Sequence, residues 1–265
     1  MKTLTSGEVK ELLLANEAEN AINIDEINWH IRNAEVKADY YDNGTCLVIV
    51  TEFRGESHVE IIPTTADFRP DDIFGYVSTN HADASVSIDV QKLNTDTLEQ
   101  TNNLFSSAFS YFKTYTDYVL TDKTMPSADP AVRLLDENDH DAFVNMEFVR
   151  ENYRPPQEIL FDSYTVKKTD DGAILAYFDG CEILGYLAYY KASNNYYDVD
   201  YIWVAPSKRQ QGIGHKLTDA YIAEILAKNA LPLWSYPKTE ISAHLAETHG
   251  FKLNRQTLSY KAKTE

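Results

Sequence analysis

The sequence predicts an α/β protein of two domains, each built around a mixed sheet, and three observations support this class. Strand-like runs of apolar residues alternate with amphipathic segments of helical period along the chain. Pro126 and Pro130 lie among small polar residues at 124–131, where neither a helix nor a strand can continue. The 265 residues, 43% of them apolar, suffice for two cores of ordinary size. We therefore expect domains at 1–125 and 131–265.

The N-terminal domain is expected to contain helices and strands in the order helix, three strands, helix, strand. Its strands are rich in β-branched residues, and its second helix places several phenylalanines near one face. The expected elements are a helix at 4–20, strands at 46–53, 58–65 and 84–90, a helix at 95–113 and a strand at 118–123.

The C-terminal domain has a more regular rhythm. Its longest helix carries apolar residues at i, i+4, i+7, i+8 and i+12, which is one face of a 3.6-residue period. The expected elements are a strand running into a helix at 132–146, a helix at 156–168, strands at 172–180, 182–192 and 196–204, a helix at 212–228, a strand at 232–237, a helix at 241–248 and a strand at 251–261.

Charge and composition exclude several classes of partner. The net charge is −17, and residues 1–130 carry −13 of it, so we expect no nucleic-acid partner and favour a cationic one. No run approaches the ~20 apolar residues that span a bilayer, and the N-terminus has no apolar leader, so a cytoplasmic protein without membrane contact is expected. Cys46 and Cys181 lie too far apart for metal-type spacing, and we expect no metal.

The segment 201–217, YIWVAPSKRQQGIGHKL, carries the chemistry of this chain. A strand ends at Val204, and Gly212 and Gly214 open an amphipathic helix. Glycines let backbone N–H groups come close to a ligand, and a helix N-terminus offers unsatisfied donors and a partial positive charge. Arg209 adds a formal charge at the same place. The segment therefore predicts a phosphate-binding turn.

Two common phosphate-binding motifs do not fit this turn. A dinucleotide-binding fold needs a third glycine or alanine three residues after Gly214, and Leu217 stands there. A Walker loop needs Gly-Lys followed by Ser or Thr, which is absent from the segment.

The pattern Arg209-x-x-Gly212-x-Gly214, preceded by Val204-Ala205-Pro206, closely resembles the acyl-CoA-binding motif of the GNAT superfamily of N-acetyltransferases. The order of expected elements across 131–265 is similar to that of the family, down to a Gly-Phe pair at 250–251 before the last strand. The resemblance implies a GNAT fold for the C-terminal half.

The resemblance also implies acetyl-CoA as cosubstrate and assigns its binding residues. The diphosphate would be held by the turn formed by Arg209, Gln210, Gln211, Gly212, Ile213 and Gly214. The pantetheine arm would pair like an added strand with backbone groups of Ile202, Trp203 and Val204, one of whose N–H groups would polarise the thioester carbonyl.

Asp200 and Asp198 are the candidate catalytic bases. Period-two alternation places both aspartates on one face of the strand with Ile202 and Val204, and a partly buried carboxylate has a raised pKa suited to a base. The alternative interpretation is that either aspartate takes no proton and only binds the substrate's cation or caps a turn.

The general acid is harder to assign. The family's usual tyrosine acid would stand at position 246, which is alanine in this sequence. His244 and Tyr236 are the candidate substitutes. Their alternative interpretation is structural.

We therefore expect an acetyl-CoA-dependent N-acetyltransferase whose acceptor is a small amine, an amino sugar or antibiotic, or a protein or peptide amine, with a preference for a cationic acceptor. The alternative is a non-catalytic CoA-binding regulatory or scaffold protein. Two interpretations stand open for residues 1–125: a degenerate GNAT-like repeat, or an unrelated α/β module that covers the acceptor site or forms the interface of a homodimer.

Overall fold

The structure, a computed structural model, describes residues 1–146 and 157–263 and divides into two compact units. Unit 1 comprises Met1–Asp117 and Leu253–Glu265, and unit 2 comprises Tyr118–Lys252. The C-terminal strand, which sequence order places in the second domain, is thus grouped with the first. Within the described residues no helix has the length and apolarity to cross a membrane.

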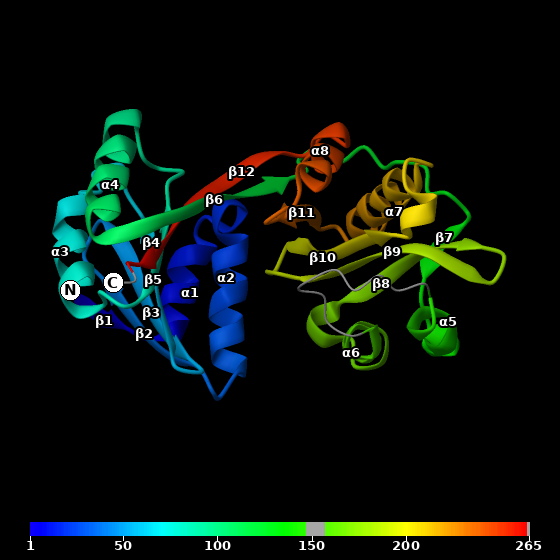
Figure 1. The fold of residues 1–265 in the computed structure, drawn as a ribbon, viewed down its shortest axis with the longest axis horizontal. Coiled ribbons are helices and arrows are strands. Elements are labelled where there is room, and N and C mark those ends of the chain that lie inside the picture. The colour runs from blue at the N-terminus through cyan, green and yellow to red at the C-terminus, as the bar shows by residue number, and fades with distance from the viewer. Residues whose placement is uncertain (147–156, 264–265) are drawn as a thin grey trace. The chain divides into compact units, whose positions relative to one another are not determined.

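Unit 2 is a sheet with helices on both faces. Its strand order is β11-β10-β9-β8-β7; β10 and β11 run parallel, and the other pairs are antiparallel. Helix α7 covers one face and helices α5 and α6 the other (Figure 1). The elements are β7 (Val132–Leu134), α5 (His140–Val144), α6 (Gln157–Phe161), β8 (Ala173–Asp179), β9 (Glu182–Lys191), β10 (Tyr196–Val204), α7 (Ile213–Ala227), β11 (Leu231–Ser235) and α8 (Glu240–Thr248).

The apolar stripe predicted for the long helix is confirmed. Ile213, Leu217, Tyr221 and Ile225 of α7 are all buried in one core cluster with residues of β8 to β11. A second cluster on the opposite face joins α5 and α6 to the other side of the same strands. The burial of both faces explains why β9 reads as an almost continuous apolar run.

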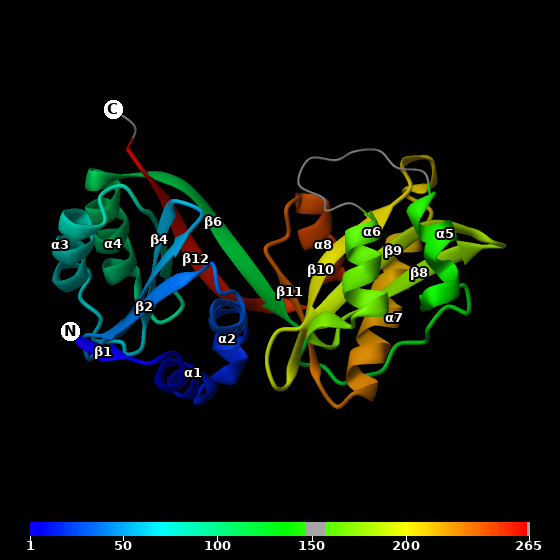
Figure 2. The ribbon, with the colours of Figure 1, turned by 90° about the horizontal axis from the view of Figure 1, so that it is seen from below.

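Unit 1 has the strand order β1-β2-β3-β4-β5-β12-β6, in which β4 and β5 run parallel. One core cluster lies between the sheet and α1 with α2, and another lies between the sheet and α3 with α4 (Figure 2). The elements are β1 (Lys2–Leu4), α1 (Ser6–Leu14), α2 (Glu17–Arg32), β2 (Lys37–Asp42), β3 (Cys46–Phe53), β4 (Glu56–Pro63), α3 (Pro70–Asn80), β5 (Ser85–Asp89), α4 (Thr95–Ala108), β6 (Phe109–Val119) and β12 (Lys252–Ala262).

Four elements of unit 1 were not predicted, namely strand β1, most of α2, strand β2 and helix α3, and the helix expected at 95–113 ends at Ala108, where β6 begins. Helix α2 buries Asn20, Asn23 and His30, so its buried face does not show an apolar period. Strand β2 is mostly polar, and α3 buries only Pro70, Ile73 and Val77. Strand β2 therefore lacks the hydrophobic alternation that sequence reasoning relies on, whereas the three buried residues of α3 do lie at i, i+3 and i+7, the period of a helix.

With these elements in place, unit 1 repeats the chain order of unit 2: strand, two helices, three strands, helix, strand, helix. In both units the one helix between two parallel strands, α3 or α7, follows the third strand of an antiparallel meander. Of the two interpretations of the N-terminal half, the structure therefore supports the GNAT-like repeat.

A buried arginine ties the C-terminal strand into unit 1. Arg255 of β12 is 2% exposed, and its Nε donates to Asp117 Oδ2 at 2.7 Å. Its guanidinium also donates to Asn23 and lies 4.0 Å from Glu60. Burial and the nearby carboxylate of Glu26 hold the pKa of Glu60 well above its usual range, so Asp117 is the carboxylate that balances Arg255.

We expect Arg255→Met to lower the free energy of unfolding of unit 1 by about 3–5 kcal/mol, because removing one partner leaves the other charge buried and uncompensated. Urea unfolding followed by circular dichroism measures the change. The matched control is Lys261→Met on the same strand, whose ammonium lies over the Phe112 ring and is exposed to solvent. Equal unfolding midpoints for the two variants would contradict the prediction.

Candidate functional site

The site begins where the two parallel strands of unit 2 stop pairing. Residues 196–198 of β10 pair with residues 231–233 of β11 and no further. Beyond that point the backbone N–H of Ser235 donates to Asp198 Oδ1 at 2.9 Å, and its hydroxyl donates to Asp198 Oδ2. A side-chain carboxylate thus replaces the ladder bonds at the point where the strands diverge.

Asp198 is consequently committed to the fold. It is 1% exposed, and Tyr190 also donates to its Oδ2 at 3.5 Å. With both oxygens accepting hydrogen bonds inside the sheet, this carboxylate is a poor candidate for taking a proton from a substrate.

A β-bulge lies next in β10, and it changes the expected orientation of the side chains. Val199 pairs with Tyr189 of β9, and Tyr201 pairs with the next residue, Ala188, so Asp200 is an extra residue without a cross-strand partner. The prediction that Asp198, Asp200, Ile202 and Val204 share one face is therefore wrong. Val199 packs with Ile202 and Val204 toward α7, because the bulge shifts the alternation by one residue.

Asp200 has the environment of a functional carboxylate. The hydroxyl of Tyr164 donates to Asp200 Oδ2 at 2.6 Å. Burial raises the pKa of Asp200 to about 6, while the hydrogen bond from Tyr164 and the positive charge of Lys238 lower it. Asp200 is thus mostly ionised at neutral pH and yet a stronger base than an exposed aspartate.

Beside Asp200, β10 offers one backbone edge that does not belong to the β9 ladder. The N–H of Ala205 donates to the Leu184 carbonyl of β9 at 2.9 Å. Because backbone groups alternate along a strand, the N–H and C=O of Trp203, two residues earlier, also point toward β9. The backbone groups of Ile202 and Val204 point to the opposite edge. Of the three residues expected to pair with a pantetheine arm, Trp203 is therefore already used by the sheet.

The turn after β10 has the features of an anion site. Gly212 has a φ of 79°, which a residue with a Cβ rarely adopts, and α7 starts at the next residue. In the described part of the chain, no backbone carbonyl accepts from the amides of residues 210–215. Arg209 donates from Nε to the Val204 carbonyl at 3.1 Å, which connects the turn to the strand end. Donors, helix N-terminus and arginine together fit a diphosphate.

The equivalent turn of unit 1 does not fit an anion. No glycine stands between the end of β4 at Pro63 and the start of α3 at Pro70. Asp71 and Asp72 occupy the first turn of α3, where a phosphate would sit, and their negative charges would repel it. Only unit 2 therefore has a turn suited to coenzyme A.

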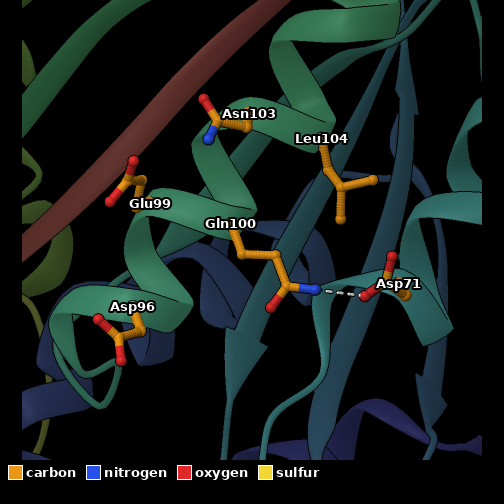
Figure 3. A pocket seen from close by; sticks show the side chains of 6 residues that line it. All are labelled: Asp71, Asp96, Glu99, Gln100, Asn103 and Leu104. Atoms are coloured by element: carbon orange, nitrogen blue, oxygen red, sulfur yellow. Dashed lines mark hydrogen bonds between the residues drawn. The ribbon is translucent and has the colours of Figure 1, made fainter.

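Unit 1 instead has an acidic pocket between α3 and α4 (Figure 3). Its volume is about 390 Å³, and Gln100 Nε2 donates to Asp71 Oδ2 at 2.5 Å across it. The lining residues are Asp71, Asp96, Glu99, Gln100, Asn103 and Leu104. Three carboxylates in one pocket reinforce the exclusion of phosphate ligands from unit 1.

The two candidate acids occupy different environments. His244 is exposed on α8, and its carbonyl accepts from Thr248. Tyr236 follows the end of β11, is half-buried and has a left-handed φ of 45° before Pro237. Ala246, at the position of the usual tyrosine, is fully buried in the core. Within the described part of the chain, the hydrogen bond to Asp200 comes from Tyr164 and from neither of these candidates.

Tyr164 is the site residue that sequence reasoning missed. It lies in a π-helical turn, Asp162–Val166, that directly follows α6 and is 36 residues from Asp200 in the chain. Nothing in its local pattern distinguishes it from other tyrosines of this chain, since the contact exists only in the folded protein.

In unit 2 a single parallel pair of strands diverges beside a helix that begins after a glycine, and this arrangement fits the GNAT fold that the sequence resemblance implies. Residues 133–251 match the model of the acetyltransferase (GNAT) family. No curated protein matches the chain.

Solved structures extend the likeness over both units. An acetyltransferase of the GNAT family from Colwellia psychrerythraea shares 15% identity and a TM-score of 0.61, over 99% of each chain. A GCN5-related N-acetyltransferase from Sphaerobacter thermophilus shares 11% identity and a TM-score of 0.60, over 99% of this chain and 95% of that one. A tandem GNAT protein from the clavulanic acid biosynthesis pathway shares 12% identity and a TM-score of 0.60, over 99% and 98%. These likenesses show that the fold is that of two GNAT-like units in one chain.

We expect Arg209→Glu to weaken the binding of coenzyme A about fivefold or more, because it reverses a charge at the phosphate turn. Isothermal titration calorimetry measures the affinity. The matched control is Arg69→Glu, an exposed residue that precedes α3 in unit 1 as Arg209 precedes α7 in unit 2. Unchanged affinity in Arg209→Glu, or an equal loss in the control, would remove the turn of unit 2 from the assignment.

Proposed function

We propose that this protein is an acetyl-CoA-dependent N-acetyltransferase whose catalytic centre lies in unit 2. The observation that carries the proposal is the placement of Asp200. A partly buried carboxylate with a raised pKa stands at a bulge, two residues from the backbone edge of β10 that pairs with neither β9 nor β11, and at the approach to a turn that fits an anion.

Each part of the site has a task in this reaction. The amides of residues 210–214 and Arg209 hold the diphosphate of coenzyme A. The backbone of Ile202 and Val204 pairs with the pantetheine arm, and an N–H of this edge polarises the thioester carbonyl. Bound acetyl-CoA supplies the activated acyl group, and the site keeps the acceptor amine within reach of it.

Asp200 removes the proton that the amine must lose. The amine nitrogen forms a bond to the acyl carbon, the carbon–sulfur bond breaks, and the carboxylate of Asp200 accepts the proton from nitrogen. With Ala246 in place of the usual tyrosine, the sulfur leaves as a thiolate, which is a tolerable leaving group without a donor. Tyr236 and His244 remain the side chains to test as its acid.

The acceptor is proposed to be a cationic amine, either a small molecule or a peptide. The argument is the net charge of −17, which raises the local concentration of cations, together with the carboxylate at the site. The competing proposal, a CoA-binding protein without chemistry, is favoured by the buried Ala246. Release of free thiol from acetyl-CoA with a panel of amines separates the two, since the competitor binds coenzyme A but releases no thiol above the enzyme-free rate.

We expect Asp200→Asn to lower kcat/KM at least about a hundredfold, the usual contribution of a general base, while coenzyme A affinity stays within about twofold. In the parent protein kcat/KM should fall with decreasing pH through about 6, as the base becomes protonated. Thiol-release assays between pH 5 and pH 9, with ~1 unit spacing, measure both. Parental turnover in the variant across this range would rule out Asp200.

The same substitution should stabilise the protein at alkaline pH. Because the pKa of Asp200 is raised in the folded state, its ionisation costs stability as pH rises through about 6. At pH ~8 Asp200→Asn should raise the free energy of unfolding by about 1–3 kcal/mol, and the gain should vanish below pH ~4. Urea unfolding at the two pH values tests this, with the exposed Asp179→Asn as the control. A loss of stability at pH ~8 would contradict it.

A further inference from the structure

We infer that Tyr164 is a positioning residue for the transfer reaction: its hydroxyl fixes one oxygen of Asp200 and leaves the other oxygen to take the proton of the amine. The inference rests on the proposed function and deepens it, by naming a residue that acts through the base.

The contact between the two residues is direct. The O–H of Tyr164 donates to Asp200 Oδ2 at 2.6 Å, the length of a hydrogen bond to an ionised acceptor. Among the described residues Asp200 has no second hydrogen bond, so Oδ1 is the oxygen that remains for a substrate. The bulge explains why a side chain must do this, because Asp200 has no partner on β9 to orient it.

The turn that carries Tyr164 is clamped at its two ends. It is π-helical from Asp162 to Val166, a conformation that is rare and frequent at functional sites. The N–H of Lys167 donates to the Asp162 carbonyl at 2.8 Å, and the Lys167 ammonium lies 2.6 Å from the Asp162 carboxylate. Asp162 and Lys167 thus close the turn through both a backbone hydrogen bond and an ion pair, and these limit the positions available to Tyr164.

A glycine makes room for the ring of Tyr164. A Cβ at Gly172 would lie 2.3 Å from Tyr164 Cδ1 and 2.7 Å from Cε1, which is closer than atoms can approach. The backbone of Gly172 is ordinary extended chain, with φ −79° and ψ 159°, so any residue fits its conformation. The added Cβ would also lie 2.9 Å from the Thr169 carbonyl oxygen, but its two shortest contacts are with the ring, so the glycine contributes to the placement of Tyr164.

The hydrogen bond also has an electrostatic effect on the base. Burial favours the protonated form of Asp200, and a donor to its oxygen favours the carboxylate. Tyr164 therefore keeps the pKa of Asp200 from rising further, and its removal would leave a larger fraction of the base protonated near neutral pH.

The test is Tyr164→Phe, which keeps the ring and deletes only the donor. We expect the acidic limb of the kcat/KM profile to move up by about one pH unit, which is about a tenfold loss at pH ~5.5 and little loss at pH ~9. The affinity for coenzyme A should stay within about twofold. An equal loss at every pH would overturn the inference, because it would assign Tyr164 a role other than holding the base.

Gly172→Ala should reproduce the same shift, since the added methyl group displaces the ring. The matched control adds Gly172→Ala to Tyr164→Ala. The contact of the new methyl group with the Thr169 carbonyl remains in that background, but the acidic limb of the pH profile should not move further, because the ring is absent from both proteins. A large difference within that pair would show that Gly172 acts independently of Tyr164 and would contradict the argument.

A direct readout separates this inference from the proposed function. The titration of Asp200, followed by infrared or carbon NMR spectroscopy of its carboxylate, should show a higher pKa in Tyr164→Phe than in the parent protein. A higher pKa without thiol release in either protein would sustain the role of Tyr164 and refute the acetyltransferase. An unchanged pKa would overturn the role of Tyr164 whatever the rates are.

Discussion

The hydrogen bonds between Asp198 and Ser235 are the constraint on which the site of unit 2 depends. Parallel strands joined by one helix would ordinarily pair along their whole length. Here a buried carboxylate receives the amide and the hydroxyl of Ser235, so the ladder between β10 and β11 ends after three pairs. Because the Asp198 side chain takes the place of a backbone acceptor, the edge of β10 beyond residue 198 does not pair with β11. The bulge that contains Asp200 lies next to this edge.

The two units show how charge decides the use of one topology. Both place a helix between parallel strands, which directs the helix N-terminus toward the end of the preceding strand. In unit 2 that N-terminus has glycine and exposed amides, and in unit 1 it has proline and two aspartates. Because carboxylates at a helix N-terminus repel phosphate, only the turn of unit 2 is suited to the coenzyme in the function proposed here.

The buried polar groups of the two units have different consequences. Arg255 and Asp117 neutralise each other, and their burial secures a strand that arrives from the far end of the chain. Among the described residues Asp200 has no neutralising partner in contact, and its burial raises its pKa at the expense of stability. The paired charges of Arg255 and Asp117 thus stabilise the fold. Asp200, which accepts a hydrogen bond from a neutral tyrosine, keeps the raised pKa that the proposed reaction needs.

The sequence by itself determined the fold class and most elements of unit 2, and it predicted the phosphate turn and Asp200 as the base, because periodicity, glycines and a motif are local properties. Only the tertiary structure decided that β12 completes unit 1, that Asp198 holds the sheet, and that Tyr164 reaches Asp200. The polar interior of α2 and the bulge in β10 escaped the sequence, since both depend on what the opposite strand or helix presents. Contacts across 36 or 138 residues of chain, such as Tyr164–Asp200 and Asp117–Arg255, leave no local pattern, because folding alone brings those groups together.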